Sequence, residues 1–285
     1  MMVFQACLDG LLYSGLYIML GLGFFLTFSV LRRVDLSFGT VIMVSIYLAS
    51  MAVSPSRFNI LALLLSCLTA IIIGFFVGSI CFGLVRGDPR NSMAATLGVW
   101  MALEELIIQL PGHGRGQFVE NFLSNQGLNW IPSLRFDHTI IFFLAITTAF
   151  GLYLFLRYTK IGLAIRTLAF DPDTAALMGI SRKIIVIIAT SIAAAIGALA
   201  GYLFAMTQHG IDAHFGMWVT IKGLVILFIS GATSIFGIIF AALILGIGER
   251  LLTELFGTTF RELIGMTLMC LIIAFIMGNN KKYRI

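Results

Sequence analysis

Long apolar runs separated by short polar connections dominate this chain. Most of the runs approach the roughly 18 to 20 residues that a helix needs to cross a bilayer, and none shows the alternating pattern of barrel strands. The seventh run is shorter and could be a weak span or a broken helix. The apolar segments are 11–31, 36–53, 60–85, 92–110, 139–156, 184–206, 218–230, 236–253 and 262–278. The pattern predicts an all-α, polytopic membrane protein with about nine transmembrane segments (8–10).

Composition supports the same fold class. Of the 285 residues, 60% are hydrophobic and only 11% are charged, and the mean hydropathy is +1.04. A water-soluble domain, a disordered chain and a secreted disulfide scaffold are therefore excluded. The four cysteines form no CxxC pair, which suits packing residues. The first long apolar run is full span length and lacks a basic leader, so no signal peptide is expected. We predict one transmembrane domain over residues 1–285.

The placement of Lys and Arg predicts the orientation, because cytoplasmic loops of membrane proteins are enriched in both. With the N-terminus outside and nine crossings, most of the 18 basic residues lie in the cytoplasm. These are Arg32, Arg33, Arg86, Arg90, Arg157, Lys160, Arg166, Arg182, Lys183, Lys281, Lys282 and Arg284. The outer ones are Arg57, Arg115, Arg135, Lys222, Arg250 and Arg261. The C-terminus is thus expected in the cytoplasm, and the net charge of +5 reflects topology, not nucleic-acid binding.

The most informative polar stretch is the cytoplasmic loop of residues 157–183. Asp171 is a favourable N-cap, Pro172 suits a first helical turn, and Gly179 suits the position after a helix end. A short helix of about two turns is therefore expected between two spans. A second polar stretch, 111–138, is placed on the outer side.

A short motif occurs twice. Asp35-Leu36-Ser37-Phe38-Gly39 and Asp212-Ala213-His214-Phe215-Gly216 both read Asp-x-x-Phe-Gly, and each precedes an apolar segment. Five crossings separate the copies, so they would face opposite sides of the membrane. This arrangement is typical of an inverted repeat.

A few charged residues inside or near the spans are candidates for a translocation pathway. Glu104 and Glu105 lie in the outer half of the fourth segment, where they could meet a cationic group or be neutralised by Lys222 or Arg115. Lys222 begins the seventh segment near the outer surface. Either contact with a solute or snorkelling to the interface explains that position.

Further polar residues have simpler explanations. Asp35 and Ser37 form an N-cap pair that could also belong to a gate. Glu249 and Arg250 lie late in the eighth segment and are expected at the membrane interface. Gly197 and Gly201 form a GxxxG pair, which permits close helix packing within the bundle or around a subunit interface.

The chain lacks the patterns that would indicate an enzyme. It has no Walker A sequence, no HExxH and no GxSxG. The histidines have no thiolate or carboxylate cluster at ligand spacing, so neither a metal nor another cofactor is expected.

Several motifs together resemble a known family. By order and spacing they are similar to permeases of ATP-binding cassette (ABC) importers of the branched-chain amino acid (LivH/LivM) type. Most of the chain is covered, and residues 86–138 are least similar. The motifs are Gly162-Leu163-Ala164-Ile165-Arg166, Asp171-Pro172-Asp173-Thr174-Ala175-Ala176-Leu177-Met178-Gly179-Ile180, Ala198-Leu199-Ala200-Gly201, Lys222-Gly223, Gly231-Ala232-Thr233-Ser234-Ile235-Phe236-Gly237 and Leu245-Gly246-Ile247-Gly248-Glu249.

The resemblance implies a permease subunit of the bacterial inner membrane that imports branched-chain or other amino acids, or similar small polar solutes. Its partners would be a second permease, identical or different, two ABC ATPase subunits, and a periplasmic or lipid-anchored solute-binding protein. The short cytoplasmic helix would dock on the ATPase, with contacts at or near Asp171, Asp173, Ala175 and Gly179. Membrane lipid surrounds such a subunit, and no nucleic acid is expected.

Two alternatives stay open at this point. The Asp35–Gly39 motif is more similar to sugar permeases of the same clan, so a sugar or nucleoside is a possible solute. An ion-coupled secondary carrier needs ion ligands inside the membrane, and Glu104 and Glu105 are the candidates for that role.

Overall fold

The structure, a computed structural model of the chain, describes residues 2–52, 59–84, 89–109, 136–208, 210–212, 214–231 and 234–256. Its long elements are helical, and most contain Leu, Ile, Val and Phe around the whole helix, as expected for helices surrounded by other helices and lipid. They are α1 (Met2–Leu31), α2 (Phe38–Ala52), α3 (Asn59–Val77), continued by a π-helical turn η1 (Gly78–Leu84), α4 (Pro89–Gln109), α5 (Phe136–Tyr158), α6 (Lys160–Phe170), α7 (Pro172–Leu177), α8 (Arg182–Thr207), α9 (Phe215–Ile229) and α10 (Ile235–Phe256).

These helices confirm the predicted polytopic all-α class. Five stretches are long and apolar enough to cross a membrane: Ala6–Leu31, Ile60–Phe82, Asp137–Tyr158, Arg182–Thr207 and Ile235–Glu254. The helices α2 and α9 have 15 residues each, or about 22 Å, which is shorter than a bilayer core of about 30 Å. The ninth predicted segment, 262–278, lies outside the described residues.

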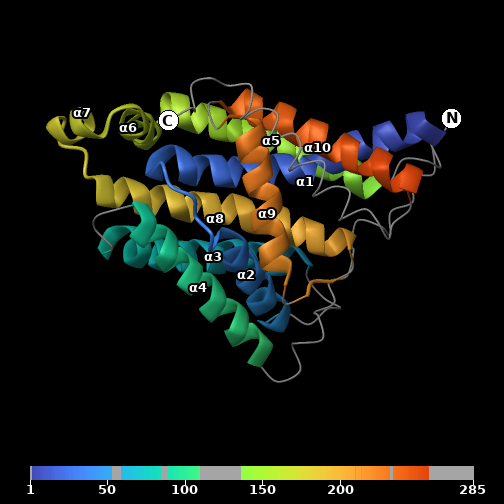
Figure 1. Cartoon of the computed structure of the whole chain (residues 1–285), viewed down its shortest axis with the longest axis horizontal. Coiled ribbons are helices and arrows are strands. Elements are labelled where there is room, and N and C mark those ends of the chain that lie inside the picture. Colours follow the sequence, from blue (N-terminus) through green and yellow to red (C-terminus); the bar gives the residue numbers. More distant parts are fainter. Residues whose placement is uncertain are drawn as a thin grey trace.

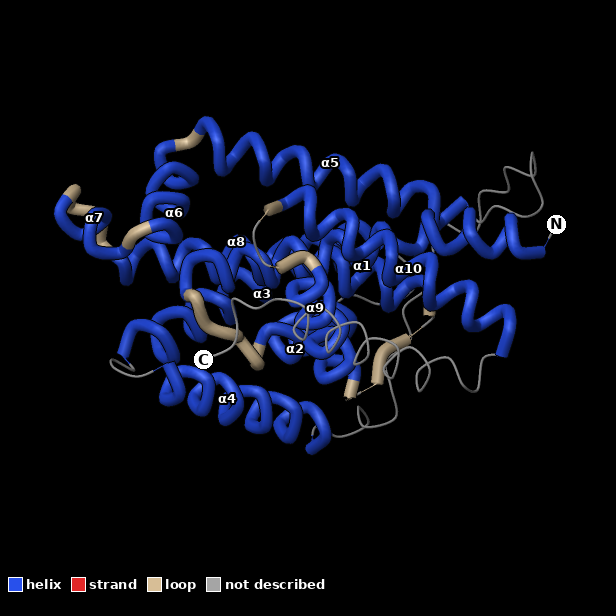
Figure 2. The backbone as a smooth tube through the Cα atoms, turned by 45° about the horizontal axis from the view of Figure 1, so that its top comes forward, coloured by secondary structure: helices blue, strands red, loops and turns tan. Residues whose placement is uncertain are grey.

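Helix α1 occupies the centre of the bundle. It packs against α5, α8, α9 and α10, and the side chains of Leu16, Tyr17 and Leu20 are completely enclosed. Figure 1 shows α1, α5, α8 and α10 along the long axis, with α9 crossing them steeply. In Figures 1 and 2, α6 and α7 lie at the end of the molecule opposite the N-terminus.

The helices form two halves with matching contacts. The α1–α10 contact in one half corresponds to the α8–α3 contact in the other, α2–α8 corresponds to α9–α1, and α2–α3 corresponds to α9–α10. Figure 1 shows α1 running toward the α6–α7 end and α8 running back from it. Opposite directions of equivalent helices support the predicted inverted repeat.

The two copies of the repeated motif meet where α2 crosses α9. Phe38 and Phe215 begin the two helices, and the next residue in each copy is glycine. A Cβ atom added to Gly216 would lie 2.9 Å from the Cα of Thr40, and one added to Gly39 would collide with the carbonyl oxygen of Gly216. Glycine is needed at both positions because the backbones touch.

The outer faces of α3 and α5 are apolar and exposed. Examples are Leu64, Leu68 and Phe76 on α3 and Phe143 and Phe150 on α5. Such faces suit contact with lipid or with another membrane subunit, since water-soluble proteins seldom leave apolar patches of this extent uncovered.

Candidate functional site

The loop of residues 157–183 forms two helices, whereas the sequence predicted one. Helix α6 is capped by Thr159, whose hydroxyl accepts a hydrogen bond from the N–H of Gly162 at 2.9 Å. Its last turn is joined to the end of α1, because the guanidinium of Arg32 donates two hydrogen bonds to the carbonyl of Ala169, at 2.7 and 3.2 Å. The loop is thus attached to the central helix of the bundle.

Helix α7 has the capping predicted from its sequence. The carboxylate of Asp171 accepts from the N–H of Asp173 at 3.0 Å and from the hydroxyl of Thr174. These hydrogen bonds lower the pKa of Asp171, so the N-cap stays ionised at neutral pH. Pro172 occupies the first helical position.

The C-terminal end of α7 is a Schellman motif. The N–H of Gly179 bonds to the carbonyl of Ala176, and the N–H of Ile180 bonds to the carbonyl of Ala175, both at 3.0 Å. Gly179 has φ +77°, a left-handed conformation that glycine adopts without strain. Defined caps at both ends make this six-residue helix a rigid unit.

The tip of α7 exposes apolar side chains. Leu177 is 89% exposed and Met178 is 68% exposed, and Asp173 also lies on the surface. Ala175, by contrast, is completely buried, so of the residues predicted at or near the ATPase contact it is the one whose side chain is not on the surface. The exposure of Leu177 and Met178 was not predicted from the sequence, although two apolar residues next to a helix-ending glycine were a usable signal.

The first copy of the repeated motif is enclosed. Asp35 and Ser37 are both buried, and the Asp35 carboxylate accepts from the Ser37 N–H at 3.0 Å and from its hydroxyl at 2.7 Å. Gly39 donates its N–H to the hydroxyl of Thr220 at 3.2 Å, which links the start of α2 to α9. The expected N-cap pair therefore lies inside the junction between the two halves.

The two glutamates of α4 have different surroundings. Glu104 contacts Nδ1 of His214 at 2.7 Å and accepts from the indole N–H of Trp100 at 2.6 Å. Glu105 lies on the surface and accepts from the side-chain amide of Gln109 at 2.8 Å. The partner of Glu104 is thus a residue of the second motif copy, whereas Lys222 and Arg115 were the partners considered from the sequence.

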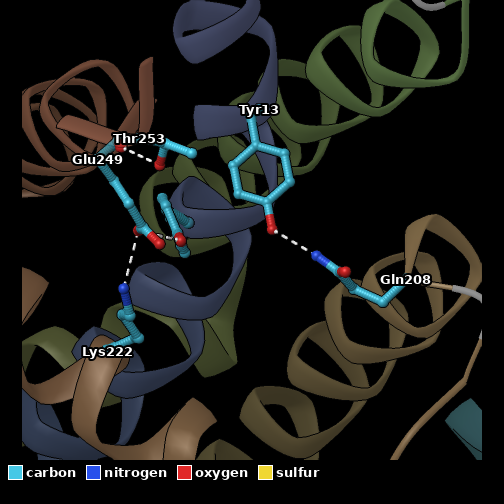
Figure 3. Close-up of polar contacts among 6 residues, drawn as sticks. Tyr13, Gln208, Lys222, Glu249 and Thr253 are labelled. Carbon is cyan, nitrogen blue, oxygen red and sulfur yellow. Dashed lines mark hydrogen bonds and ion pairs between the residues drawn. The ribbon is translucent and has the colours of Figure 1, made fainter. Parts of the chain in front are cut away.

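Lys222 is the centre of a buried polar cluster. Its ammonium donates to the carboxylate of Glu249 at 2.8 Å, and the hydroxyl of Tyr17 donates to the same oxygen at 2.5 Å. Lys222 is 1% exposed and Glu249 is 4% exposed. The ammonium also lies 5.2 Å from the ring centre of Trp218, within range of a cation–π interaction. Figure 3 shows the Lys222 and Glu249 side chains directed at each other.

This cluster gives Lys222 and Glu249 a partner that was not expected from the sequence. Lys222 was placed near the outer surface, and Glu249 was placed at the membrane interface. Both side chains are enclosed between α1, α9 and α10, where each neutralises the other as a buried charge requires, so Lys222 does not snorkel to a water-exposed surface.

A second polar group lies beside the cluster. The amide of Gln208 donates to the Tyr13 hydroxyl at 3.4 Å (Figure 3). The guanidinium of Arg250 lies 4.6 Å from the ring centre of Tyr13, and the Tyr13 ring meets the Tyr17 ring edge to face. The aromatic rings of α1 therefore connect the ion pair to the end of α8.

The GxxxG pair of α8 serves packing within the chain. A Cβ added to Gly197 would lie 2.6 Å from Cδ1 of Ile42 and 2.7 Å from Cζ of Phe38. Gly201 also faces α2, against Ile42 and Ile46. In this structure the two glycines face α2 of the same chain.

These observations define the class of protein. The described residues form a helical membrane bundle of two matching halves, with buried charges inside and a capped helix exposed at one end. They contain no group of three or more His, Cys, Asp or Glu side chains that could hold a metal ion. Inverted halves with short helices at equivalent positions are typical of transport proteins.

The chain belongs to the family described as "branched-chain amino acid transport system / permease component", whose model matches residues 6–277. The chain is therefore a membrane-embedded permease subunit of the ABC transporter type, from a family of amino acid permeases. The resemblance to this family that its motifs indicated is confirmed.

Curated relatives agree over nearly the whole chain. The high-affinity branched-chain amino acid transport system permease protein BraD of Pseudomonas aeruginosa is 23% identical over 95% of this chain and 93% of the relative. The corresponding LivH protein of Escherichia coli K12 is 22% identical over 94% and 92%. A probable branched-chain amino acid transport permease LivH of Methanocaldococcus jannaschii is 28% identical over 88% and 82%. No solved structure gives a significant match.

Proposed function

We propose that this chain is the permease subunit of an ABC importer for branched-chain or other amino acids, and that α7 transmits ATP-driven movement from a separate ATPase. One observation carries the coupling role: α7 is capped at both ends and exposes Asp173, Leu177 and Met178 at one end of the molecule. A rigid, partly apolar tip suits a groove in a partner protein.

The wider assembly follows from this role. A second permease, identical or different, would complete the pathway, two ATPase subunits would bind the α7 tips, and a periplasmic or lipid-anchored binding protein would deliver the solute. The names of the compared relatives support an amino acid as the solute. We propose a bacterial inner-membrane location with the N-terminus outside and α6–α7 in the cytoplasm.

The pathway is proposed to follow the junction between the two halves, past Asp35, Ser37 and Glu104. These residues lie at the starts of α2 and α9 or contact them, and helix N-termini favour carboxylate groups. Glu105 is proposed at the outer mouth. Lys222, also a pathway candidate from the sequence, lies behind this junction in its pair with Glu249.

The coupling role is tested by reconstituting the full transporter and measuring ATP hydrolysis stimulated by the binding protein. Asp173→Arg reverses a charge on the tip, and Gly179→Pro removes the left-handed C-terminal turn. Both variants are expected to abolish stimulated hydrolysis while the subunit still inserts in the membrane. Glu254→Arg, at an exposed position on α10, is the matched control and should keep normal stimulation.

Normal stimulation in both α7 variants would contradict the coupling role. Uphill accumulation of solute by the subunit alone, driven by a proton or sodium gradient, would contradict the importer assignment itself and favour an ion-coupled carrier.

A further inference from the structure

A large cavity lies where the membrane helices end near α6. Its volume is about 1360 Å³, and it is lined by the last turns of α1 and α5, the end of α9, the start of α10, α6 and the start of α7. Three arginines contribute to its wall: Arg32 from α1, Arg157 from α5 and Arg166 from α6. The cavity belongs neither to the exposed face of α7 nor to the Lys222–Glu249 cluster.

The positive charge of this cavity is only partly balanced locally. Within the residues that the structure describes, no carboxylate forms a salt bridge with Arg32, Arg157 or Arg166. The carboxylate of Asp171 also lines the cavity and offsets one of the three positive charges, although its oxygens are engaged by Asp173 and Thr174 and not by an arginine. Three guanidinium groups around one opening favour an anion with several oxygen atoms, such as a phosphate.

The rest of the wall is apolar and aromatic. The buried part of the lining includes Leu26, Leu156 and Leu227. The exposed part includes the rings of Phe228 and Phe236. Exposed phenylalanines beside arginines at the ends of membrane helices suit the boundary between hydrocarbon and headgroups. A soluble phosphate would use only the arginines, whereas a phospholipid would use both the arginines and the apolar wall.

We propose that this cavity binds an anionic phospholipid, with the phosphate and headgroup at Arg157 and Arg166 and an acyl chain against the apolar wall. Basic pockets between transmembrane helices bind such headgroups in other membrane proteins. The proposal goes beyond the permease function and depends on neither the solute nor the coupling role of α7.

The site has a functional consequence because its lining includes both α6 and the ends of the membrane helices beside it. A bound lipid would join the ends of α5 and α10 to α6, and α6 is bonded to α1 through Arg32. Removing the lipid is therefore expected to loosen α6 relative to the bundle.

The test uses the full chain in nanodiscs containing phosphatidylglycerol and phosphatidylcholine in equal amounts, with retained lipid measured by native mass spectrometry. The wild type should retain phosphatidylglycerol preferentially. In the double variant Arg157→Gln/Arg166→Gln the preference should fall by about fivefold for each arginine. Both side chains are exposed, so the variant is expected to fold. Arg32 is left intact because it holds α6.

The matched control is Arg182→Gln/Lys183→Gln. These two basic residues are exposed at the start of α8 and do not line the cavity. The control should retain the wild-type preference. An equal loss in both double variants would show general surface attraction and overturn the site.

Two further outcomes would replace the lipid with another ligand. Displacement of phosphatidylglycerol by excess inorganic phosphate would identify a site for a soluble anion. Loss of ATPase binding by the Arg157→Gln/Arg166→Gln variant in nanodiscs of phosphatidylcholine alone would identify a protein contact. Either result would overturn the proposal, whereas retained ATPase binding and resistance to phosphate support it.

Discussion

The two halves of the molecule share a packing pattern but differ in their buried polar groups. Aligning Gly39 with Gly216 places Ser45 opposite Lys222 and Ile72 opposite Glu249. Ser45 is buried and donates to the Ile42 carbonyl of its own helix at 2.6 Å, while Ile72 is largely exposed. At the aligned positions Ser45 and Ile72, two uncharged residues stand where the second half has the Lys222–Glu249 pair.

The halves also exchange large and small side chains. In the second half, Gly223 of the short helix α9 receives the ring of Phe24 from α1. At the equivalent contact in the first half, Ile46 of the short helix α2 packs against Gly201 of α8. Each contact combines one large and one small residue, but the large one comes from the long helix in one half and from the short helix in the other. Interior volume is preserved although residue identity is not.

The largest expected effect comes from breaking the ion pair of the second half. Lys222→Met leaves the Glu249 carboxylate buried without its cation, and we expect the free energy of unfolding to fall by about 3–5 kcal/mol. Lys222→Met combined with Glu249→Leu should lose much less, because no charge is left unpaired. Denaturant unfolding of the purified chain, followed by tryptophan fluorescence, measures both.

The control for this comparison is Ser45→Ala at the equivalent position, with an expected loss of about 1 kcal/mol or less. A double variant as unstable as Lys222→Met alone would show that the pair stabilises the chain by more than mutual neutralisation.

A smaller effect is expected where the two halves touch. Gly216→Ala places a methyl group 2.9 Å from the Cα of Thr40, so α2 and α9 must separate, at a cost of about 1–3 kcal/mol. Gly98→Ala in α4 meets nothing within 4 Å and should stabilise the helix by up to about 1 kcal/mol. Thermal unfolding of both variants tests the contact, and equal melting temperatures would refute a close crossing at Gly216.

The smallest effect concerns the contact between His214, an exposed residue of the second motif copy, and Glu104. His214 is 77% exposed at its contact with Glu104, and exposed pairs contribute about 0.2–1 kcal/mol. A double-mutant cycle with Glu104→Gln and His214→Gln measures this coupling, with Glu105→Gln as the matched change on α4. A coupling above about 2 kcal/mol would mean that this contact stabilises the junction as strongly as a buried pair does.

Much of the fold could be predicted because hydrophobicity marks helices that lie in lipid or among other helices. The runs 139–156 and 184–206 correspond closely to α5 and α8. The caps of α7 were also predictable, since Asp171 and Gly179 act on backbone groups within a few residues of themselves. Helix α6 was missed because its 11 residues, Lys160–Phe170, are too few to span a membrane and lie in a loop with charged residues at both ends.

Contacts between distant residues could not be predicted in the same way. No local rule pairs Lys222 with Glu249, because their meeting depends on the turn between α9 and α10 and on the position of α1. The burial of Ala175 depends on how α7 packs beneath α6. A charged residue inside an apolar run indicates that a partner is needed, but the partner is identified only by the tertiary structure.

The two hydrogen bonds from Arg32 to the Ala169 carbonyl have a mechanical consequence. They connect the last turn of α6 to the central helix α1, which contacts α8, α9 and α10. A displacement of α6 along the molecule must therefore either tilt α1 or stretch these bonds. Since tilting α1 shifts its contacts with α8 and α10 together, a movement of a few ångströms at the tip would reach both sides of the bundle in a single step.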